Sequence, residues 1–265
     1  MSGASSQRWR LPGLWSAGRA MRRAAACWPW CVPGARRLAA CALARRHTEA
    51  RDPTLAQFGN WWLDPLRLNE KSIVYSCGVG THIEFDLAVT HLIGCPVHMF
   101  DPTPKSWELM NTRAGHRLLR YEPIGVWSED GTARFWHDRA YPQASAVANA
   151  SITNLFGREE AFDAPVLTIA SLLAAHGHDR LDVLKLDVEG AAPAVLLQML
   201  ASGVFPDQIA AEIELPRCAR AMTGFCGEVR ELCEELRARG YRLVRLPHGR
   251  GGPTLRILAL RGDPA

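Results

Sequence analysis

The chain has 265 residues, of which 48% are hydrophobic, so it is long enough for one globular α/β domain with an additional segment. Its charge is unevenly placed, because residues 1–48 contain nine arginines but no lysine and no acidic residue. The remaining 22 basic and 27 acidic residues leave residues 49–265 net negative, which argues against DNA or RNA as the main partner. No charge-free apolar run reaches the roughly 18 residues that a transmembrane helix needs.

Residues 1–48 are predicted to be a leader separate from a domain at residues 49–265, because they lack the hydrophobic periodicity of a folded element. An organelle transit peptide, a weak signal anchor over residues 24–43 and a disordered leader without a role all remain open for this segment. The eight cysteines form no C-x-x-C pair, and neither they nor the scattered histidines have metal-ligand spacing, so no metal site is expected. Reduced cysteines favour a cytoplasmic protein, unless the leader targets it to an organelle or a membrane.

Predicted strands and helices alternate after the leader. The first half is predicted to contain strand Ile73–Cys77, helix His82–Ile93, strand Val97–Phe100 and helix Pro104–Ala114. Residues 117–126 are expected to be extended and to pair with residues 132–137 across a tight turn at Glu129–Gly131. The segment Tyr141–Asp163, rich in Ala, Ser and Asn, is interpreted as an irregular loop or lid over a site.

The second half continues the alternation. It is predicted to contain helix Thr168–His176, strand Leu181–Leu186, helix Ala191–Ala201, strand Gln208–Leu215, helix Gly227–Arg239 and strands Tyr241–Leu246 and Leu255–Leu260. This pattern indicates an α/β fold with a mostly parallel, seven-stranded sheet and helices on both of its faces. The last two strands are separated by a turn, and they predict an antiparallel hairpin at the edge of the sheet.

A glycine turn follows the first predicted strand. It contains Gly78 and Gly80, and Asp101 ends the next strand. In a doubly wound sheet such glycines let the backbone approach a ligand, and an acid at the next strand tip receives ribose hydroxyls. The third glycine of the dinucleotide fingerprint is missing, because Ile83 and Glu84 follow instead. The pattern therefore favours a nucleoside without phosphates, such as S-adenosylmethionine, over a tight turn with a surface Asp.

A second motif, LDVLKLDVEG, covers residues 181–190. Lys185 and Asp187 are two residues apart on a predicted buried strand, so their side chains share a face near its carboxyl end. Ligands in such sheets bind at the carboxyl ends of strands, so both side chains are expected beside the cofactor crevice. The alternative is a structural Lys–Asp pair, with Asp187 or Glu189 meeting the N-terminus of the next helix.

These segments resemble a known family. YSCGVGTHIEFDLA, HMFDPTPKS and DVLKLDVEGA are similar to FkbM-type S-adenosylmethionine-dependent methyltransferases, over about Tyr75 to Leu215. The resemblance implies a class I methyltransferase (Rossmann-like) fold and O-methylation of a hydroxyl on a sugar or small natural product. It also implies cofactor binding by Tyr75, Ser76, Gly78, Gly80, Asp101, Pro102 and Asp187. The chain departs from the family pattern at Glu214, where the family often has His, and at Thr81 and His82, where it often has acidic residues.

Methyl transfer to a hydroxyl benefits from a base, and the candidates are Asp187, Glu212 and Glu214, with Lys185 orienting one of them. No ligand spacing demands a metal ion. The expected partner is a small-molecule or glycan acceptor, selected by Tyr141–Asp163 and by the region before Ile73. Trp61 and Trp62 in that region could stack on a sugar, although packing under the sheet is favoured.

Three other functions remain as alternatives. A nicotinamide-dependent oxidoreductase is disfavoured by the missing third glycine and by the lack of a Tyr-x-x-x-Lys relay. A catalytically inactive Rossmann-like module would carry a broken cofactor site, whereas the glycines and strand-end acids are present. RNA methylation is disfavoured by the net negative charge of residues 49–265.

Overall fold

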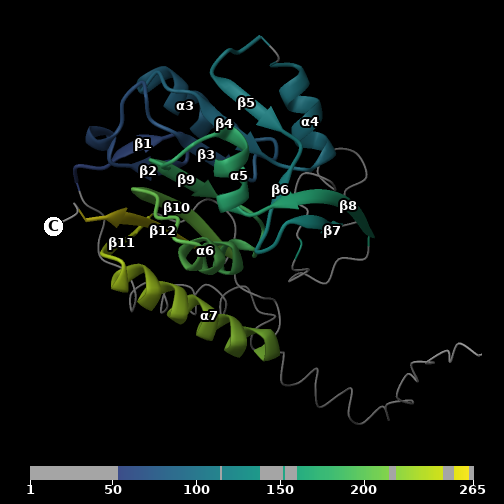
Figure 1. The fold of residues 1–265 in the computed structure, drawn as a ribbon, viewed down its shortest axis with the longest axis vertical. Helices are drawn as coiled ribbons and strands as arrows, with labels where there is room; N and C mark the ends of the chain where they lie inside the picture. The colour runs from purple at the N-terminus through teal and green to yellow at the C-terminus, as the bar shows by residue number, and fades with distance from the viewer. Residues whose placement is uncertain are drawn as a thin grey trace, which may run out of the picture.

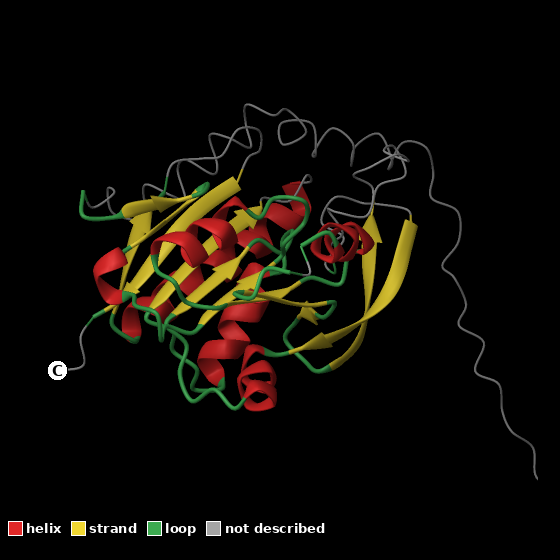
Figure 2. Cartoon of the chain, turned by 90° about the horizontal axis from the view of Figure 1, so that it is seen from above, coloured by secondary structure: helices red, strands yellow, loops and turns green. Residues whose placement is uncertain are grey.

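The computed structural model describes residues 53–113, 115–137, 152, 160–214, 219–246 and 254–262. The predicted leader lies outside these ranges, and so does most of the expected loop Tyr141–Asp163. Within the described ranges, a central sheet is covered by helices on both faces, as Figures 1 and 2 show from two directions. The predicted α/β class is confirmed. None of the described helices is both long and apolar enough to cross a membrane.

The central sheet has seven strands in the order β11-β12-β10-β9-β3-β4-β5. These are β3 (Val74–Cys77), β4 (Val97–Phe100), β5 (Leu119–Glu122), β9 (Val183–Leu186), β10 (Gln208–Glu214), β11 (Tyr241–Arg245) and β12 (Thr254–Arg261). β12 runs antiparallel to both of its neighbours, while the pairs from β10 to β5 are parallel. The mostly parallel sheet with a C-terminal hairpin is therefore confirmed. At the edge that this hairpin forms, the outermost strand is β11, because β12 inserts between β11 and β10.

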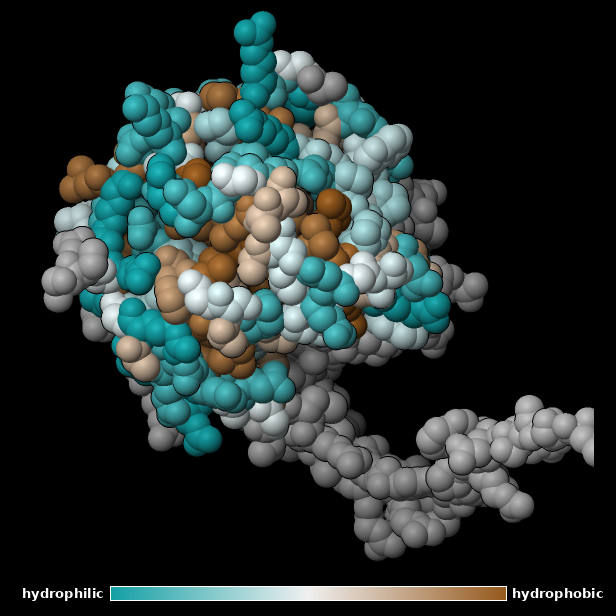
Figure 3. Space-filling view, viewed as in Figure 1, coloured by the Kyte–Doolittle hydropathy of each residue, from teal (hydrophilic) through white to brown (hydrophobic). Residues whose placement is uncertain are grey.

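Both faces of the sheet carry an apolar core, because the parallel strands are buried on both sides. One core packs against α5 (Ile169–His176), α6 (Ala192–Ala201) and α7 (Ala219–Ala238). The opposite core packs against α3 (Glu84–Leu92), α4 (Pro104–Asn111) and an N-terminal hairpin. Hydrophilic residues cover most of the surface seen in Figure 3, with smaller apolar areas between them. The core is thus shielded on both sides and the strand ends remain available for a site.

The N-terminal hairpin was not predicted. It pairs β1 (Ala56–Phe58) with β2 (Trp61–Leu63), and a short 3-10 helix, η1 (Pro65–Arg67), follows it. Trp61 is only 1% exposed and belongs to the core beneath the sheet, so its predicted packing role is confirmed. Strands of three residues are too short to give a periodic signal in the sequence.

A second, three-stranded sheet has the order β6-β8-β7, formed by β6 (Gly125–Val126), β7 (Gly131–His137) and β8 (Glu160–Leu167). The predicted pairing of residues 132–137 with residues 117–126 is wrong, because β7 pairs antiparallel with β8 instead. Cross-strand contacts explain this choice: the rings of Phe135 and Phe162 stack at 5.5 Å, and Arg134 forms an ion pair with Asp163. The expected loop Tyr141–Asp163 is consequently a strand from Glu160 onwards.

The strand order reverses direction between β3 and β9. From β3 the chain builds outward through β4 to β5, and from β9 it builds the other way to β10. The two crossover connections therefore leave on opposite sides of this point, and a crevice is expected at the carboxyl ends of β3 and β9.

Candidate cofactor and active site

A cavity of about 190 Å³ lies at the carboxyl ends of β3, β4 and β9, at this switch point. It is lined by residues from distant parts of the chain: Asn60, Trp61, Gly78–His82, Phe100–Thr103, Gly125, Val126, Phe135, Ile152, Lys185, Asp187–Glu189, Ala191 and Arg256. Its lining combines the apolar side chains of Phe100, Val126, Phe135 and Ile152 with the acidic residues Asp187 and Glu189. This mixture suits a ligand that carries both an apolar ring and positive charge.

The glycine loop at residues 78–80 is held by the carboxylate of Asp101, which is 3% exposed. Its Oδ2 accepts hydrogen bonds from the backbone N–H groups of Val79 (2.7 Å) and Gly80 (2.8 Å), and its Oδ1 accepts one from Thr103 (2.8 Å). The carbonyl of Gly80 accepts from the hydroxyl of Ser106 at 2.9 Å. The amides at Val79 and Gly80 are therefore already satisfied by a negatively charged side chain.

Gly78 allows the loop to pack directly against the chain after β9. Its φ of +81° is in the left-handed region, and a Cβ at this position would lie 1.8 Å from the carbonyl oxygen of Asp187. The N–H of Gly78 donates to the carbonyl of Phe100, and the N–H of Asp187 donates to the carbonyl of Cys77. A side chain at position 78 would push apart the two strand ends that form the floor of the cavity.

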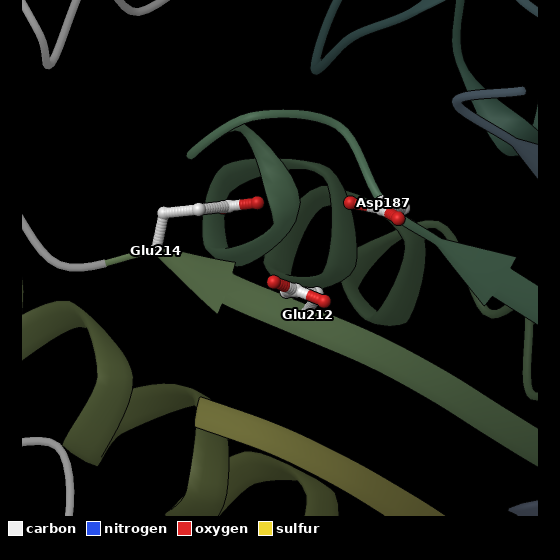
Figure 4. Close-up of side chains that lie close together, drawn as sticks. All are labelled: Asp187, Glu212 and Glu214. Carbon is white, nitrogen blue, oxygen red and sulfur yellow. The ribbon is translucent and has the colours of Figure 1, made fainter. Parts of the chain in front are cut away.

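Three carboxyl groups converge beside the cavity (Figure 4). Glu212 and Glu214 extend from β10 and Asp187 follows β9, and one oxygen of each lies within 4.8 Å of the others. Glu214 is 6% exposed, and its Oε2 accepts a hydrogen bond from the N–H of Gly190 at 2.6 Å. Burial, followed by the charges of Glu189, Asp187 and Glu212, raises the pKa of Glu214 well above its usual range. Burial and the neighbouring charges thus favour the protonated form of Glu214.

Glu212 is paired with a cation. The guanidinium of Arg256, on β12, donates to its Oε2 and also to the carbonyl of Asn60 at 3.2 Å. Burial, followed by the charge of Asp187, raises the pKa of Glu212, and Arg256 opposes that rise. The three carboxyl groups have the oxygen chemistry of a Mg²⁺ or Ca²⁺ site, although the sequence offered no ligand spacing for one. Of the three, only Asp187 lines the cavity.

The residues predicted from the sequence divide into those at the cavity and those behind it. Gly78, Gly80, Asp101, Pro102, Lys185 and Asp187 line it. Tyr75 and Ser76 do not, because β3 is fully buried and their side chains lie within the core layers. The ammonium of Lys185 donates to the carbonyl of Gly78, so Lys185 contacts the glycine loop, and its predicted role in orienting a carboxylate stays a prediction.

Several residues that line the cavity were not predicted from the sequence. Phe135 and Ile152 come from the region of the second sheet, and Arg256 comes from the last strand, so nothing local connects them to the motifs. Glu189 left a weak signal, since it precedes Gly190 in the second motif. Among the described residues it is the one non-glycine residue with positive φ, at 51°, and such backbone strain is frequent at functional sites.

Comparison with known proteins places this site in a family context. Residues 78–243 match the methyltransferase FkbM domain. The human protein named probable methyltransferase-like protein 24 is 30% identical over 152 residues, which are 56% of this chain and 34% of that protein. The chain thus spans about a third of the length of this curated relative.

Among solved structures, an rRNA methylase from Streptococcus thermophilus has a TM-score of 0.42 at 11% identity, covering 74% of this chain and 90% of that one. The fibrillarin pre-rRNA processing protein of Methanococcus jannaschii has a TM-score of 0.43 at 12% identity, covering 78% and 70%.

Proposed function

The chain belongs to the methyltransferase FkbM family, and we propose that it transfers a methyl group from S-adenosylmethionine to a hydroxyl oxygen of a sugar or another small molecule. S-adenosylmethionine is its cofactor, and it supplies an electrophilic methyl group on a positively charged sulfur. The choice of a hydroxyl oxygen as acceptor rests on the position of Asp187, whose carboxylate lines the cavity where β9 ends. A neutral hydroxyl is a poor nucleophile, and a carboxylate within reach can take its proton as the new bond forms.

The cavity fits this cofactor. A carboxylate has about four lone-pair sites, and three are used on Asp101, which leaves Oδ1 able to accept one ribose hydroxyl. The apolar side chains of Phe100, Val126 and Phe135 in the lining suit an adenine ring. The carboxylates of Asp187 and Glu189 in the same lining would attract the sulfonium and ammonium groups of the cofactor.

The glycine loop argues against a nicotinamide cofactor. Dinucleotide sites bind a pyrophosphate with free backbone N–H groups after the first strand. Here the N–H groups of Val79 and Gly80 donate to Asp101, whose charge would also repel a phosphate. The loop therefore lacks the free N–H groups with which a nicotinamide-dependent oxidoreductase would bind the pyrophosphate.

Within the carboxyl cluster we assign the base role to Asp187. Glu212 is neutralised by Arg256, and Glu214 is buried against the backbone of Gly190. Both lie beside Asp187 in the carboxyl cluster but outside the lining of the cavity.

Transfer of a tritiated methyl group tests the acceptor class. The full chain is incubated with labelled S-adenosylmethionine and separate pools of neutral sugars, small phenols and alcohols, RNA, and protein. We expect the label in a small-molecule pool, in a product that resists mild base as a methyl ether does. In the Asp187→Asn variant we expect a loss of turnover of about 100-fold or more, measured at saturating S-adenosylmethionine. Label in RNA or protein alone would contradict the proposed acceptor, and full turnover of the variant would contradict the base.

A further inference from the structure

Lys185 is a buried cation directly beneath the glycine loop. It lies on β9 opposite Ser76 of β3 and is 3% exposed. Its ammonium donates to the carbonyl of Gly78 and lies 5.7 Å from the centre of the Trp61 ring. The loop is thus held at each end of its backbone: Lys185 binds a carbonyl, and Asp101 binds the two amides that follow.

A buried carboxyl group without a hydrogen bond lies close to this lysine. Asp86, in the first turn of α3, is 1% exposed, and neither of its oxygens has a hydrogen-bond partner among the described residues. Burial raises the pKa of Asp86, and the charge of Lys185 is the largest influence that opposes the rise, followed by the Ser76 hydroxyl. An isolated carboxylate would be very costly here, and the charge of Lys185 offsets part of that cost.

The two charges bracket the glycine loop. Lys185 contacts the residue at its start, and Asp86 is on the helix that begins directly after it, at Glu84. Asp86 does not line the cavity, whereas Lys185 does line it and donates one hydrogen bond to the Gly78 carbonyl.

We propose that Lys185 is a positioning residue for cofactor binding, which fixes the Gly78 carbonyl and the loop above it while Asp86 serves as its buried counter-charge. This goes beyond the proposed reaction, and it rests on the cofactor site of the proposed function but not on the identity of the acceptor. Two roles follow for one lysine. Its charge balances Asp86 and stabilises the fold, and its hydrogen bond to Gly78 shapes the surface that the cofactor contacts.

These roles separate in a double-mutant cycle on the full chain. The variants are Lys185→Met, Asp86→Asn and the combination of both, measured by thermal unfolding and by calorimetric titration with S-adenosylhomocysteine. Each single change leaves one buried charge without its partner, so we expect the Tm to fall by roughly 10 °C. The double variant removes both charges and recovers most of that loss.

Affinity is expected to behave differently from stability. Both variants that lack Lys185 lose the bond to Gly78, so they bind S-adenosylhomocysteine about tenfold to a hundredfold more weakly, the loss of one charged hydrogen bond. Asp86→Asn keeps that bond and binds within about threefold of the wild type. Val89→Ala is the matched control, because Val89 is a fully buried residue of the same helix away from the loop: it lowers the Tm without changing the affinity.

The outcomes distinguish the two proposals. Suppose that the wild type binds S-adenosylhomocysteine. If the double variant then regains affinity together with stability, or if Lys185→Met binds with normal affinity, the positioning role is overturned while the proposed function stands. If Lys185→Met does not fold, the double variant carries the test. If the wild-type chain itself does not bind S-adenosylhomocysteine, both proposals fail.

Discussion

Replacing Asp101 is expected to disturb the fold as well as the cofactor site. Its carboxylate accepts three backbone hydrogen bonds at 2.7–2.8 Å while only 3% of the residue is exposed. Each buried N–H left unpaired costs about 1–3 kcal/mol. Because Gly80 is only partly buried, we expect Asp101→Ala to lower the free energy of unfolding by about 3–6 kcal/mol in total.

Asp101→Asn separates charge from geometry. Its amide retains one acceptor oxygen, which can serve the N–H groups of Val79 and Gly80, but its NH₂ group then faces the N–H of Thr103. We therefore expect a loss of about 1–3 kcal/mol, between the wild type and the alanine variant.

Denaturant unfolding monitored by circular dichroism measures these losses, and calorimetry with S-adenosylhomocysteine follows the binding. Asp179→Ala, at an exposed position, serves as a control and should stay within about 0.5 kcal/mol of the wild type. An alanine variant at position 101 that is as stable as this control would refute the structural role. The residue would then be a ligand-binding group only.

Three further predictions follow from the same contacts. Gly78→Ala should abolish binding of S-adenosylhomocysteine and lower the Tm, because the new Cβ would lie 1.8 Å from the Asp187 carbonyl; normal binding in calorimetry would contradict this. Arg256→Met should lower the free energy of unfolding, measured with denaturant, by about 3–5 kcal/mol, because it leaves Glu212 buried without its cation. Adding Glu212→Gln should recover part of that loss. A double variant no more stable than Arg256→Met would argue against the ion pair. Burial, followed by the neighbouring His176, His178 and Arg120, lowers the pKa of His98 from 6.5 to about 4. Between pH 7 and pH 4 the unfolded chain therefore takes up a proton that the folded chain does not, so the free energy of unfolding should fall by about 3 kcal/mol. An unchanged pH slope in His98→Asn would show that other groups cause the loss.

The central strands were predictable because their signals are local. Fully buried parallel strands such as β3, β4 and β9 are continuous apolar runs, and turns or helices with clear punctuation separate them. The helices also carry end signals. Thr168 caps α5 with its side chain, and Gly177 ends that helix in the left-handed conformation.

The second sheet was mispredicted because its pairing is nonlocal. A turn at Glu129–Gly131 suggested that the strand after it would return to the strand before it. The preceding strand, β6, has only two residues, whereas β8 offers eight and an aromatic partner for Phe135. Sequence shows where a strand can form, but the partner depends on contacts across long separations.

The site shows the same division. Gly78, Asp101 and Asp187 were predictable because strand ends in a doubly wound sheet meet at one crevice. Their bonds to one another were not, because those depend on side-chain orientations at the strand ends. Sequence spacing therefore indicated a ribose-binding acid, and the structure adds that the same acid holds the glycine loop.

Calorimetric titration of the full chain with S-adenosylhomocysteine, with NAD titrated in parallel, decides which cofactor the cavity binds. We expect micromolar binding of S-adenosylhomocysteine and no binding of NAD, because the amides of the glycine loop are occupied by Asp101. Binding of NAD alone would contradict the assignment of the cavity.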